Sequence, residues 1–392
     1  MSFEIECITE FAAAPGPDVW NHVLAGSAAD PLFLSRQFQE AWWCTFCCNP
    51  SASCQLALLL LREGGTLVGV APFYLSVVDD AAWAEETSRA AGWRRIVARA
   101  AAQADPAVDL PEGRTAAGAA AATDAEPPQA APRTGERVIR LVGGVAVADY
   151  LNIIAPLGRE CEAWTAVLAY WARRAADWDV LDLHSLPPAA ACAARCAAAT
   201  SHGTVWCGVE ETCPALALPA AWDDYLAALG KKDRHELRRK LRRAESYPDP
   251  LTWKIVNKGP ELAAALETFI ALHRRSDEAK ARFMTPVMEM FFHRVLTALG
   301  PTGRLEVATL YADDHPVAAY LSFREAARLL LYNSGYDPRY GGYNTGFALL
   351  VYRIQQAIEE GVQTFDFLRG DERYKYDLGA QDQFIYRVII RK

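Results

Sequence analysis

Apolar residues recur along the first half of the chain in short runs and alternating patterns that predict β-strands. Two of these runs, residues 55–62 and 66–76, flank Glu63-Gly64-Gly65, and this arrangement predicts a tight hairpin. Other segments repeat apolar residues at helical spacing. The strands expected in this half are residues 3–8, 55–62, 66–76, 138–142, 150–154, 179–186 and 204–218, and the helices are residues 35–46, 161–176 and 189–199.

The second half opens with a long helical pattern. Three strands then follow one another closely, and a Gly-rich loop and a helix separate them from the next strand. This order predicts a mixed α/β (α+β) fold and not the regular alternation of a doubly wound sheet. The expected helices are residues 222–245, 261–280, 286–299 and 347–360, and the strands are residues 251–257, 305–311, 316–324, 328–335, 364–368 and 383–390.

The chain has 392 residues, which is enough for two domains of ordinary size. We expect an N-terminal lobe over residues 1–220 and a C-terminal lobe over residues 221–392. Both halves follow a coarse plan of strands, helix and strand, although no sequence repeat relates them. Residues 105–136 differ in character, because residues 116–132 read AAGAAAATDAEPPQAAP without apolar periodicity. This composition predicts a disordered surface insertion.

Composition and charge narrow the classes of function. Hydrophobic residues make up 52% of the chain and the formal net charge is −8, so nothing global favours nucleic-acid binding. No apolar run reaches the ~18 residues of a membrane span, and the N-terminus lacks a signal-peptide pattern, so we expect a cytoplasmic protein. Cys44 and Cys47 are interpreted as thiols on the apolar side of a helix. No spacing predicts a metal site.

A basic segment, residues 231–243, contrasts with the acidic chain. It holds eight Lys or Arg residues and two acidic residues, a net charge of +6. Leucines at near-helical spacing mark its buried side, so the basic residues should form an exposed belt. The belt could meet an anionic acceptor, a CoA phosphate, an RNA backbone or an anionic membrane, or it could be only a solvated face. The anion-binding candidates are Arg234, Arg238, Arg239 and Arg242.

A Gly-rich loop, residues 338–346, joins a predicted strand to a predicted helix. A helix N-terminus exposes N–H groups and a partial positive charge, so this turn could hold a phosphate, or it could be a plain tight turn. Glycine allows the backbone to approach such a ligand closely. The candidate ligand-binding residues of this loop are Arg339, Gly341, Gly342, Asn344, Thr345 and Gly346.

The run Phe365-Asp366-Phe367-Leu368-Arg369-Gly370-Asp371-Glu372-Arg373-Tyr374-Lys375-Tyr376 interleaves charges with aromatic residues after a strand. Arg369 and Lys375 could bind a phosphate or carboxylate, with Tyr374 beside them, and Asp371 and Glu372 could accept a proton from an amine. The alternative is a salt-bridge cluster that staples the C-terminal strand. Because the helix 347–360 has the length of an ordinary crossover, we expect this run to lie close to the Gly-rich loop, in a cleft between the two lobes.

These two motifs carry a resemblance to known families. The loop, as Arg339-x-x-Gly342-x-Asn344, is similar to the CoA pyrophosphate loop of GNAT acyltransferases, with Asn344 where a small residue is usual. The C-terminal run resembles the signature of the CelD/BcsL-type acetyltransferases of bacterial cellulose biosynthesis, which are FemAB-like. The resemblance implies two tandem GNAT-like lobes, each a mixed and mainly antiparallel sheet flanked by helices. It also implies acyl-CoA as a co-substrate, with no permanent cofactor and no metal.

The leading hypothesis is a direct acyl transfer from acyl-CoA to an amine or hydroxyl of a sugar or cell-envelope precursor. The resemblance implies catalytic roles for Asp371, Glu372 and Lys375. A second hypothesis is a Fem-like transferase that uses aminoacyl-tRNA, and nucleic acid is expected as a partner only in that case. A third is a degenerate scaffold that binds an anionic polymer without catalysis. Peripheral membrane association is a further expectation, and the sequence does not identify the acceptor.

Overall fold

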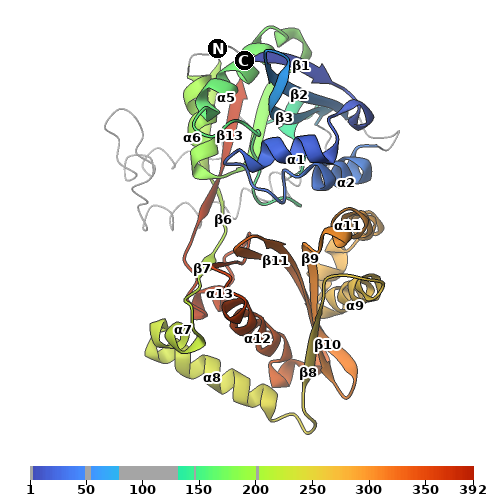
Figure 1. The fold of residues 1–392 in the computed structure, drawn as a ribbon, viewed down its shortest axis with the longest axis vertical. Coiled ribbons are helices and arrows are strands. Elements are labelled where there is room, and N and C mark those ends of the chain that lie inside the picture. The colour runs from blue at the N-terminus through green and yellow to red at the C-terminus, as the bar shows by residue number, and fades with distance from the viewer. Residues whose placement is uncertain (1–2, 49–53, 79–130, 145–146, 200–202) are drawn as a thin grey trace. The chain divides into compact units, whose positions relative to one another are not determined.

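The computed structural model describes residues 3–48, 54–78, 131–144, 147–199 and 203–392. The chain forms two compact units, and in Figure 1 each of them consists of a sheet flanked by helices. The first unit consists of residues 1–212 and 384–392, and the second consists of residues 213–383. The chain therefore leaves the first unit once and returns to it for its last strand.

The first unit is built on a seven-stranded sheet with the order β1-β2-β3-β4-β5-β13-β6. Every neighbouring pair is antiparallel except β4 with β5. Gly64 and Gly65 both have positive φ, so the predicted hairpin between β2 and β3 is confirmed. The strands are β1 Glu4–Ile8, β2 Gln55–Glu63, β3 Thr66–Val77, β4 Arg137–Leu141, β5 Val180–Leu186, β6 Thr204–Thr212 and β13 Phe384–Arg391.

Helices cover this sheet with aromatic side chains. Trp164 and Trp171 of the crossover helix α5 pack edge-to-face on Phe73 of β3, and all three rings are buried. Ser35 caps α2 by accepting a hydrogen bond from the Phe38 N–H. The helices are α1 Pro17–Ala25, α2 Arg36–Phe46, α5 Glu160–Ala172 and α6 Pro188–Ala198, with 3-10 turns at Phe11–Ala13 and Ala175–Asp177.

The second unit is built on a six-stranded sheet with the order β7-β12-β11-β10-β9-β8. Only β11 and β12 run parallel. Figure 1 shows α9 and α11 on one face of this sheet, and α12 on the other face with α8 beyond it. The strands are β7 Ala215–Ala217, β8 Thr252–Val256, β9 Leu305–Ala312, β10 His315–Glu325, β11 Arg328–Tyr336 and β12 Thr364–Asp366.

The expected long helix over residues 222–245 is two helices, α7 and α8. They separate because Leu229 is extended and Gly230 stands at the N-cap of α8. The helices of this unit are α7 Trp222–Ala228, α8 Lys231–Glu245, α9 Glu261–Ser276, α10 Glu278–Phe283, α11 Pro286–Leu299, α12 Thr345–Glu359 and α13 Arg373–Asp377, with 3-10 turns at Gly300–Thr302 and Pro338–Tyr343.

The two units follow the same path. In each, a four-stranded antiparallel meander carries helices between its first and second strands, and a crossover helix then leads to a fifth, parallel strand. The crossover is α5 in the first unit and α12 in the second, and the parallel pairs are β4–β5 and β11–β12. The expected fold class, two lobes with mixed and mainly antiparallel sheets, is confirmed.

The last strand corrects the expected division of the chain. The sequence assigned residues 384–392 to the C-terminal lobe, but β13 lies between β5 and β6 of the first sheet. A buried ion pair fixes it there, because the Arg387 guanidinium Nε lies 2.7 Å from a carboxylate oxygen of the fully buried Asp182. Arg140 pairs with the same carboxylate at 3.3 Å.

The expected insertion over residues 105–136 falls mainly outside the described residues. Residues 131–136, the last part of this segment, are described and form part of the first unit. Gly135 donates its N–H to the carbonyl of Val78, and Glu136 forms an ion pair with Arg391 at 2.6 Å. The Ala131 carbonyl also accepts a hydrogen bond from Arg391 at 2.8 Å, so these contacts attach residues 131–136 to the first unit.

We predict that Arg387→Met lowers the free energy of unfolding by about 3–5 kcal/mol at pH 7, because it leaves the buried Asp182 charge without its main partner. Urea unfolding followed by circular dichroism measures the loss. The matched control is Arg62→Met, which removes an exposed pair with Glu6 and should cost no more than about 1 kcal/mol. Equal losses of unfolding free energy in the two variants would contradict a stabilising role for the buried Asp182–Arg387 pair.

The same carboxylate gives stability a pH dependence. Burial alone would raise the pKa of Asp182, but Arg387 and His184 hold it well below the ordinary value of 3.8. Its stabilising contribution is therefore complete above that ordinary value and is lost as the pH falls towards the lowered pKa. Unfolding measured below pH 4 should show the loss in the wild type.

Candidate functional site

Two parallel strands of the second unit separate after a short paired stretch. β11 and β12 are in register only at Arg328–Leu330 against Thr364–Asp366. β11 then continues to Tyr336, whereas the chain after β12 bends away, with Leu368 at a positive φ and the Phe367 N–H donating to the Pro214 carbonyl. A bulge in β11 opposite β10 leaves Tyr332 without a partner in the register.

A pocket of about 720 Å³ opens where these strands part. It lies entirely within the second unit and draws residues from β10, β11, α8, α10, α12 and the chain after β12. The lining residues are Lys240, Asp277, Lys280, Tyr320, Leu331, Tyr332, Asn333, Ser334, Tyr336, Gly341, Asn344, Thr345, Gly346, Phe347, Leu350, Phe367, Arg369, Glu372, Tyr374 and Lys375.

The N-terminus of α12 forms one wall of the pocket. Thr345, the first residue of this 15-residue helix, is 1% exposed, and its hydroxyl has no hydrogen-bond partner in the structure. The Asn344 side chain does not cap the helix, so the first-turn N–H groups are not taken by it. The Lys240 ammonium lies 4.4 Å from the Phe347 ring centroid, beside this turn. A buried hydroxyl, a helix N-terminus and a cation together suit an anionic ligand.

The predicted loop residues divide between the pocket and other contacts. Gly341, Asn344, Thr345 and Gly346 line the pocket, whereas Arg339 and Gly342 do not. Arg339 instead pairs with the buried Asp337 at 2.7 Å, and its guanidinium lowers the pKa of that carboxyl. The Gly342 carbonyl accepts a hydrogen bond from Arg243 at 2.9 Å. These contacts favour a structural role for Arg339 over the ligand contact that its position in the loop predicts.

The C-terminal run contributes Arg369, Glu372, Tyr374 and Lys375 to the pocket wall, but not Asp371. The run and the Gly-rich loop therefore meet at one pocket, as the crossover helix predicts. Burial raises the pKa of Tyr374, so its phenol keeps its proton at neutral pH.

Lys375 holds the chain after β12 in its bend. The side chain is buried, and its ammonium donates to the carbonyls of Arg369 at 3.0 Å and Gly370 at 2.9 Å, with Phe367 and Leu368 each at 3.4 Å. The Glu372 carboxylate lies 2.9 Å from the same ammonium. An ammonium whose donors are occupied in this way positions the loop, so the contacts favour positioning over the catalytic role expected for Lys375.

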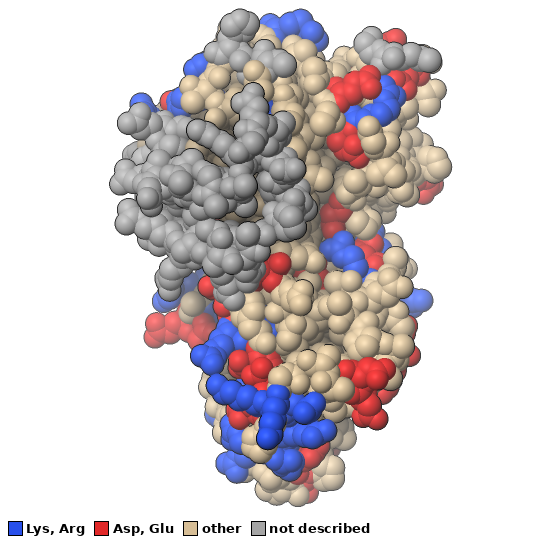
Figure 2. Space-filling model, turned by 90° about the vertical axis from the view of Figure 1, so that its left-hand side faces the viewer, with Lys and Arg blue, Asp and Glu red and all other residues tan. Residues whose placement is uncertain are grey.

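None of the four predicted arginines of α8 lines the pocket. Arg234 donates to the Leu226 carbonyl, and Arg239 pairs with Glu236 at 2.7 Å. Arg238 and Arg242 are exposed. Figure 2 shows Lys and Arg side chains gathered over the part of the surface where α8 lies.

Sequence reasoning missed several lining residues, among them Lys240, Lys280 and Asn333. The helical spacing of the α8 leucines could have placed Lys240 on a different edge from Arg238. No comparable pattern marks Asn333, because a bulge changes the direction of strand side chains without a sequence signature.

The first unit differs from the second at the end of its parallel strand pair. Beyond the paired part of β4 and β5, its own chain fills the position where the second unit has its pocket. Leu151 donates its N–H to the Ser185 carbonyl at 2.8 Å, and Ile154 pairs with Val70 of β3. Leu151, Ile153 and Ile154 are all buried.

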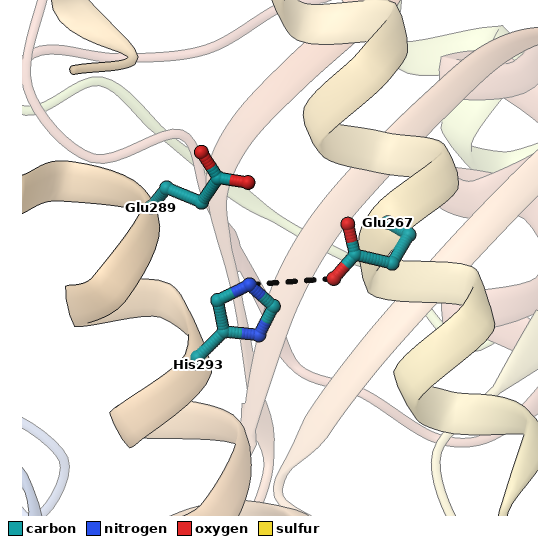
Figure 3. A group of neighbouring side chains, drawn as sticks. All are labelled: Glu267, Glu289 and His293. Carbon is teal, nitrogen blue, oxygen red and sulfur yellow. Dashed lines mark ion pairs between the residues drawn. The ribbon is translucent and has the colours of Figure 1, made fainter. Parts of the chain in front are cut away.

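Among the described residues, one group of side chains could hold a metal ion, namely Glu267, Glu289 and His293 of α9 and α11 (Figure 3). His293 Nε2 lies 3.3 Å from the Glu267 carboxylate, and Arg274 already pairs with Glu289 at 2.5 Å. None of the three lines the pocket. Among the helices described, none combines the length and the apolar character that crossing a membrane requires.

Comparisons with known proteins agree with this geometry. Residues 231–376 match the family profile described as an acetyltransferase (GNAT) domain, and this segment contains every residue that lines the pocket. The crystal structure of FemX aligns with 98% of this chain and 96% of its own, at 10% identity and a TM-score of 0.60. The second unit thus resembles a GNAT acetyltransferase domain over the matched residues, and the whole chain shares its fold with FemX.

Two further solved structures align over nearly the full length. A conserved protein of unknown function from Bacteroides thetaiotaomicron covers 99% of this chain and 100% of its own, at 10% identity and a TM-score of 0.53. A tandem GNAT protein from the clavulanic acid biosynthesis pathway covers 99% and 98%, at 12% identity and a TM-score of 0.44. No curated protein sequence matches the chain significantly.

We predict that Lys375→Met lowers the free energy of unfolding by about 1–3 kcal/mol, because it removes the shared donor of four loop carbonyls. Urea unfolding of the full chain measures the change. Lys258→Met, an exposed lysine outside the pocket, is the control and should stay within about 0.5 kcal/mol of the wild type. A Lys375→Met protein as stable as this control would show that the loop holds its bend without the ammonium.

Proposed function

We propose that the second unit transfers an acyl group from acyl-CoA directly to an amine or hydroxyl acceptor. The observation that carries this proposal is the N-terminus of α12, where Thr345 has a buried hydroxyl without a hydrogen-bond partner and lines a pocket at which two parallel strands part. That wall offers N–H donors, a hydroxyl and the Lys240 ammonium to the diphosphate of CoA. The acyl chain and thioester would then extend into the gap between β11 and β12.

Direct transfer requires the acceptor nucleophile to attack the thioester carbonyl, after which the thiolate of CoA leaves. In this proposal, backbone N–H groups of β11 near the Tyr332 bulge stabilise the oxyanion, because this stretch of β11 has no β12 partner. Glu372 accepts the proton of the nucleophile, and Tyr374 donates a proton to the departing thiolate. Asp371 does not line the pocket, so we assign it no proton transfer. Most of the rate gain comes from holding the two substrates together.

The finer assignments rest on the sequence resemblance. It supports membership of the CelD/BcsL-type branch and an acceptor that is a sugar or cell-envelope precursor. Arg369, at the end of β12, suits a phosphate or carboxylate of either substrate. Acyl-CoA enters as a co-substrate, so no resident cofactor takes part in the proposed reaction.

We predict that Thr345→Val weakens acetyl-CoA binding about 10-fold, because the proposed hydrogen bond from the hydroxyl to the charged diphosphate is lost. Folding should stay intact, because the hydroxyl has no hydrogen-bond partner in the protein. Isothermal titration of the full chain with acetyl-CoA measures the affinity. Thr297→Val on α11, which lies outside the pocket, is the matched control. The proposal fails if the wild type does not bind acetyl-CoA, or if Thr345→Val binds it as tightly as the control.

A second candidate function has its own supporting observation. Lys231, Arg238 and Arg242 lie along one exposed edge of α8, and none has an ionic partner among the described residues. This edge suits an anionic polymer, which keeps open the Fem-like use of aminoacyl-tRNA and the binding scaffold without catalysis.

We predict that the double variant Arg238→Glu, Arg242→Glu binds unacylated tRNA at least 10-fold more weakly than the wild type while binding acetyl-CoA normally. Fluorescence anisotropy at several salt concentrations measures the affinity and its salt dependence. Arg294→Glu, on the exposed surface of α11, is the control. If the wild type shows no tRNA binding, the use of aminoacyl-tRNA is excluded.

A further inference from the structure

Asn333, on β11 beside the bulge, has a carboxamide whose orientation follows from the structure. Its Oδ1 accepts a hydrogen bond from the Ser334 backbone N–H at 2.8 Å. A backbone N–H can only donate, so the atom that faces it must be the carboxamide oxygen. The Nδ2 group therefore points elsewhere. It has no partner among the described residues, and Asn333 lines the pocket.

His273 of α9 shares this oxygen and fixes it from the other side. Its Nε2 lies 3.1 Å from Asn333 Oδ1, and because that oxygen accepts, Nε2 must carry the proton. Burial lowers the pKa of His273 to about 4, and the buried Nδ1 has no hydrogen-bond partner, so the ring is neutral. Gly335 allows this contact, because a Cβ there would lie 2.4 Å from the His273 backbone nitrogen.

Lys280 of α10 brings a charged donor to the same place. Its ammonium donates to the Ser334 carbonyl at 2.6 Å and to the Ser334 hydroxyl at 2.9 Å, which leaves one of its three donors. Two carboxylates line the pocket nearby, and each already has a partner. The Asp277 carboxylate accepts a hydrogen bond from the backbone N–H of Lys280 at 2.8 Å, and the Glu372 carboxylate pairs with the Lys375 ammonium. This end of the pocket therefore offers one neutral and one cationic donor, both anchored on Ser334.

The two ends of the pocket lie on opposite faces of the sheet. The helix N-terminus belongs to α12, and the donors described above lie beside α9 and α10, whereas Figure 1 shows α9 and α12 on opposite faces. If the diphosphate of the acyl donor occupies the α12 end, the α9–α10 end is left for the acceptor. Two adjacent donors, one of them charged, match the two oxygens of a carboxylate.

We propose that Asn333 and Lys280 bind a carboxylate of the acceptor, and that His273 positions Asn333 for this contact. The acceptor class is thus an amine or hydroxyl compound that also carries a carboxylate. This inference rests on the proposed acyl-CoA-dependent function and adds to it the class of the second substrate.

The test uses pairs of amines that differ only in the carboxylate, namely glycine with glycinamide and β-alanine with β-alaninamide. Transfer from acetyl-CoA by the full chain is followed as release of the CoA thiol. We expect kcat/KM for the carboxylate member to exceed that for the amide by about 10-fold or more. The amine of each amide member is less basic, so a larger fraction of it is unprotonated near neutral pH, and this difference opposes the expected preference.

The variants separate contact from positioning. Asn333→Asp replaces the amide donor with a negative charge, which repels the acceptor carboxylate, and should abolish or reverse the preference. Lys280→Met should abolish the preference through a higher KM for the carboxylate member. His273→Ala should reduce the preference, and His273→Gln should restore part of it, because a glutamine amide can still donate to Asn333. Lys258→Met, outside the pocket, is the control and should retain the wild-type preference.

The outcomes distinguish this inference from the function on which it rests. Failure of the wild type to bind acetyl-CoA overturns the proposed function. Binding of acetyl-CoA without transfer to any carboxylate member, or equal transfer to both members of each pair, overturns the acceptor class alone. Retention of the preference in Asn333→Asp overturns the assignment of Asn333.

Discussion

The separation of β11 from β12 is the constraint on which the candidate site depends. Parallel strands normally stay paired, since each unpaired N–H or carbonyl that is buried costs free energy. Here β12 ends at Asp366, and the buried Lys375 ammonium gathers the carbonyls of the next four residues. These carbonyls accept the hydrogen bonds that the ammonium would otherwise donate to water. In return, the ammonium supplies the donors that a neighbouring strand would otherwise provide. The gap along β11 persists because the chain that would close it is already bonded.

The two units follow the same path of the chain but differ in the space beyond their fourth strands. Both units have a meander, a crossover helix and a parallel fifth strand. In the first unit, residues 150–154 bond to β5 and β3, and their apolar side chains fill the space beyond β4. In the second, the corresponding space is lined by polar side chains and forms the pocket. The topology thus provides the gap, and the segment that follows the fourth strand decides whether the gap is filled by the chain or remains open as a pocket.

Local patterns in the sequence predicted most elements, because alternation, glycine turns and helical spacing are local properties. They also brought the Gly-rich loop and the C-terminal run together, since a crossover of ordinary length connects them. The pattern of β13 predicts a strand but does not specify which sheet it joins, because its place depends on distant partners, namely its pairing with β5 and β6 and the Asp182–Arg387 pair across 205 positions. Asn333 was missed for a related reason: its orientation depends on His273, a residue of a different helix.

The charge of the whole chain and the charge of the site have opposite signs, and α8 shows how this arises. Its cations lie on different edges of one helix, so they face different surroundings. Lys240, only 20% exposed, faces the pocket, where its charge acts in a medium less polar than water. Arg238 and Arg242 face solvent, where salt screens them. A net charge of −8 therefore does not oppose an anionic substrate. The Lys240 ammonium beside the first turn of α12 places a positive charge at this end of the pocket, although the chain as a whole is acidic.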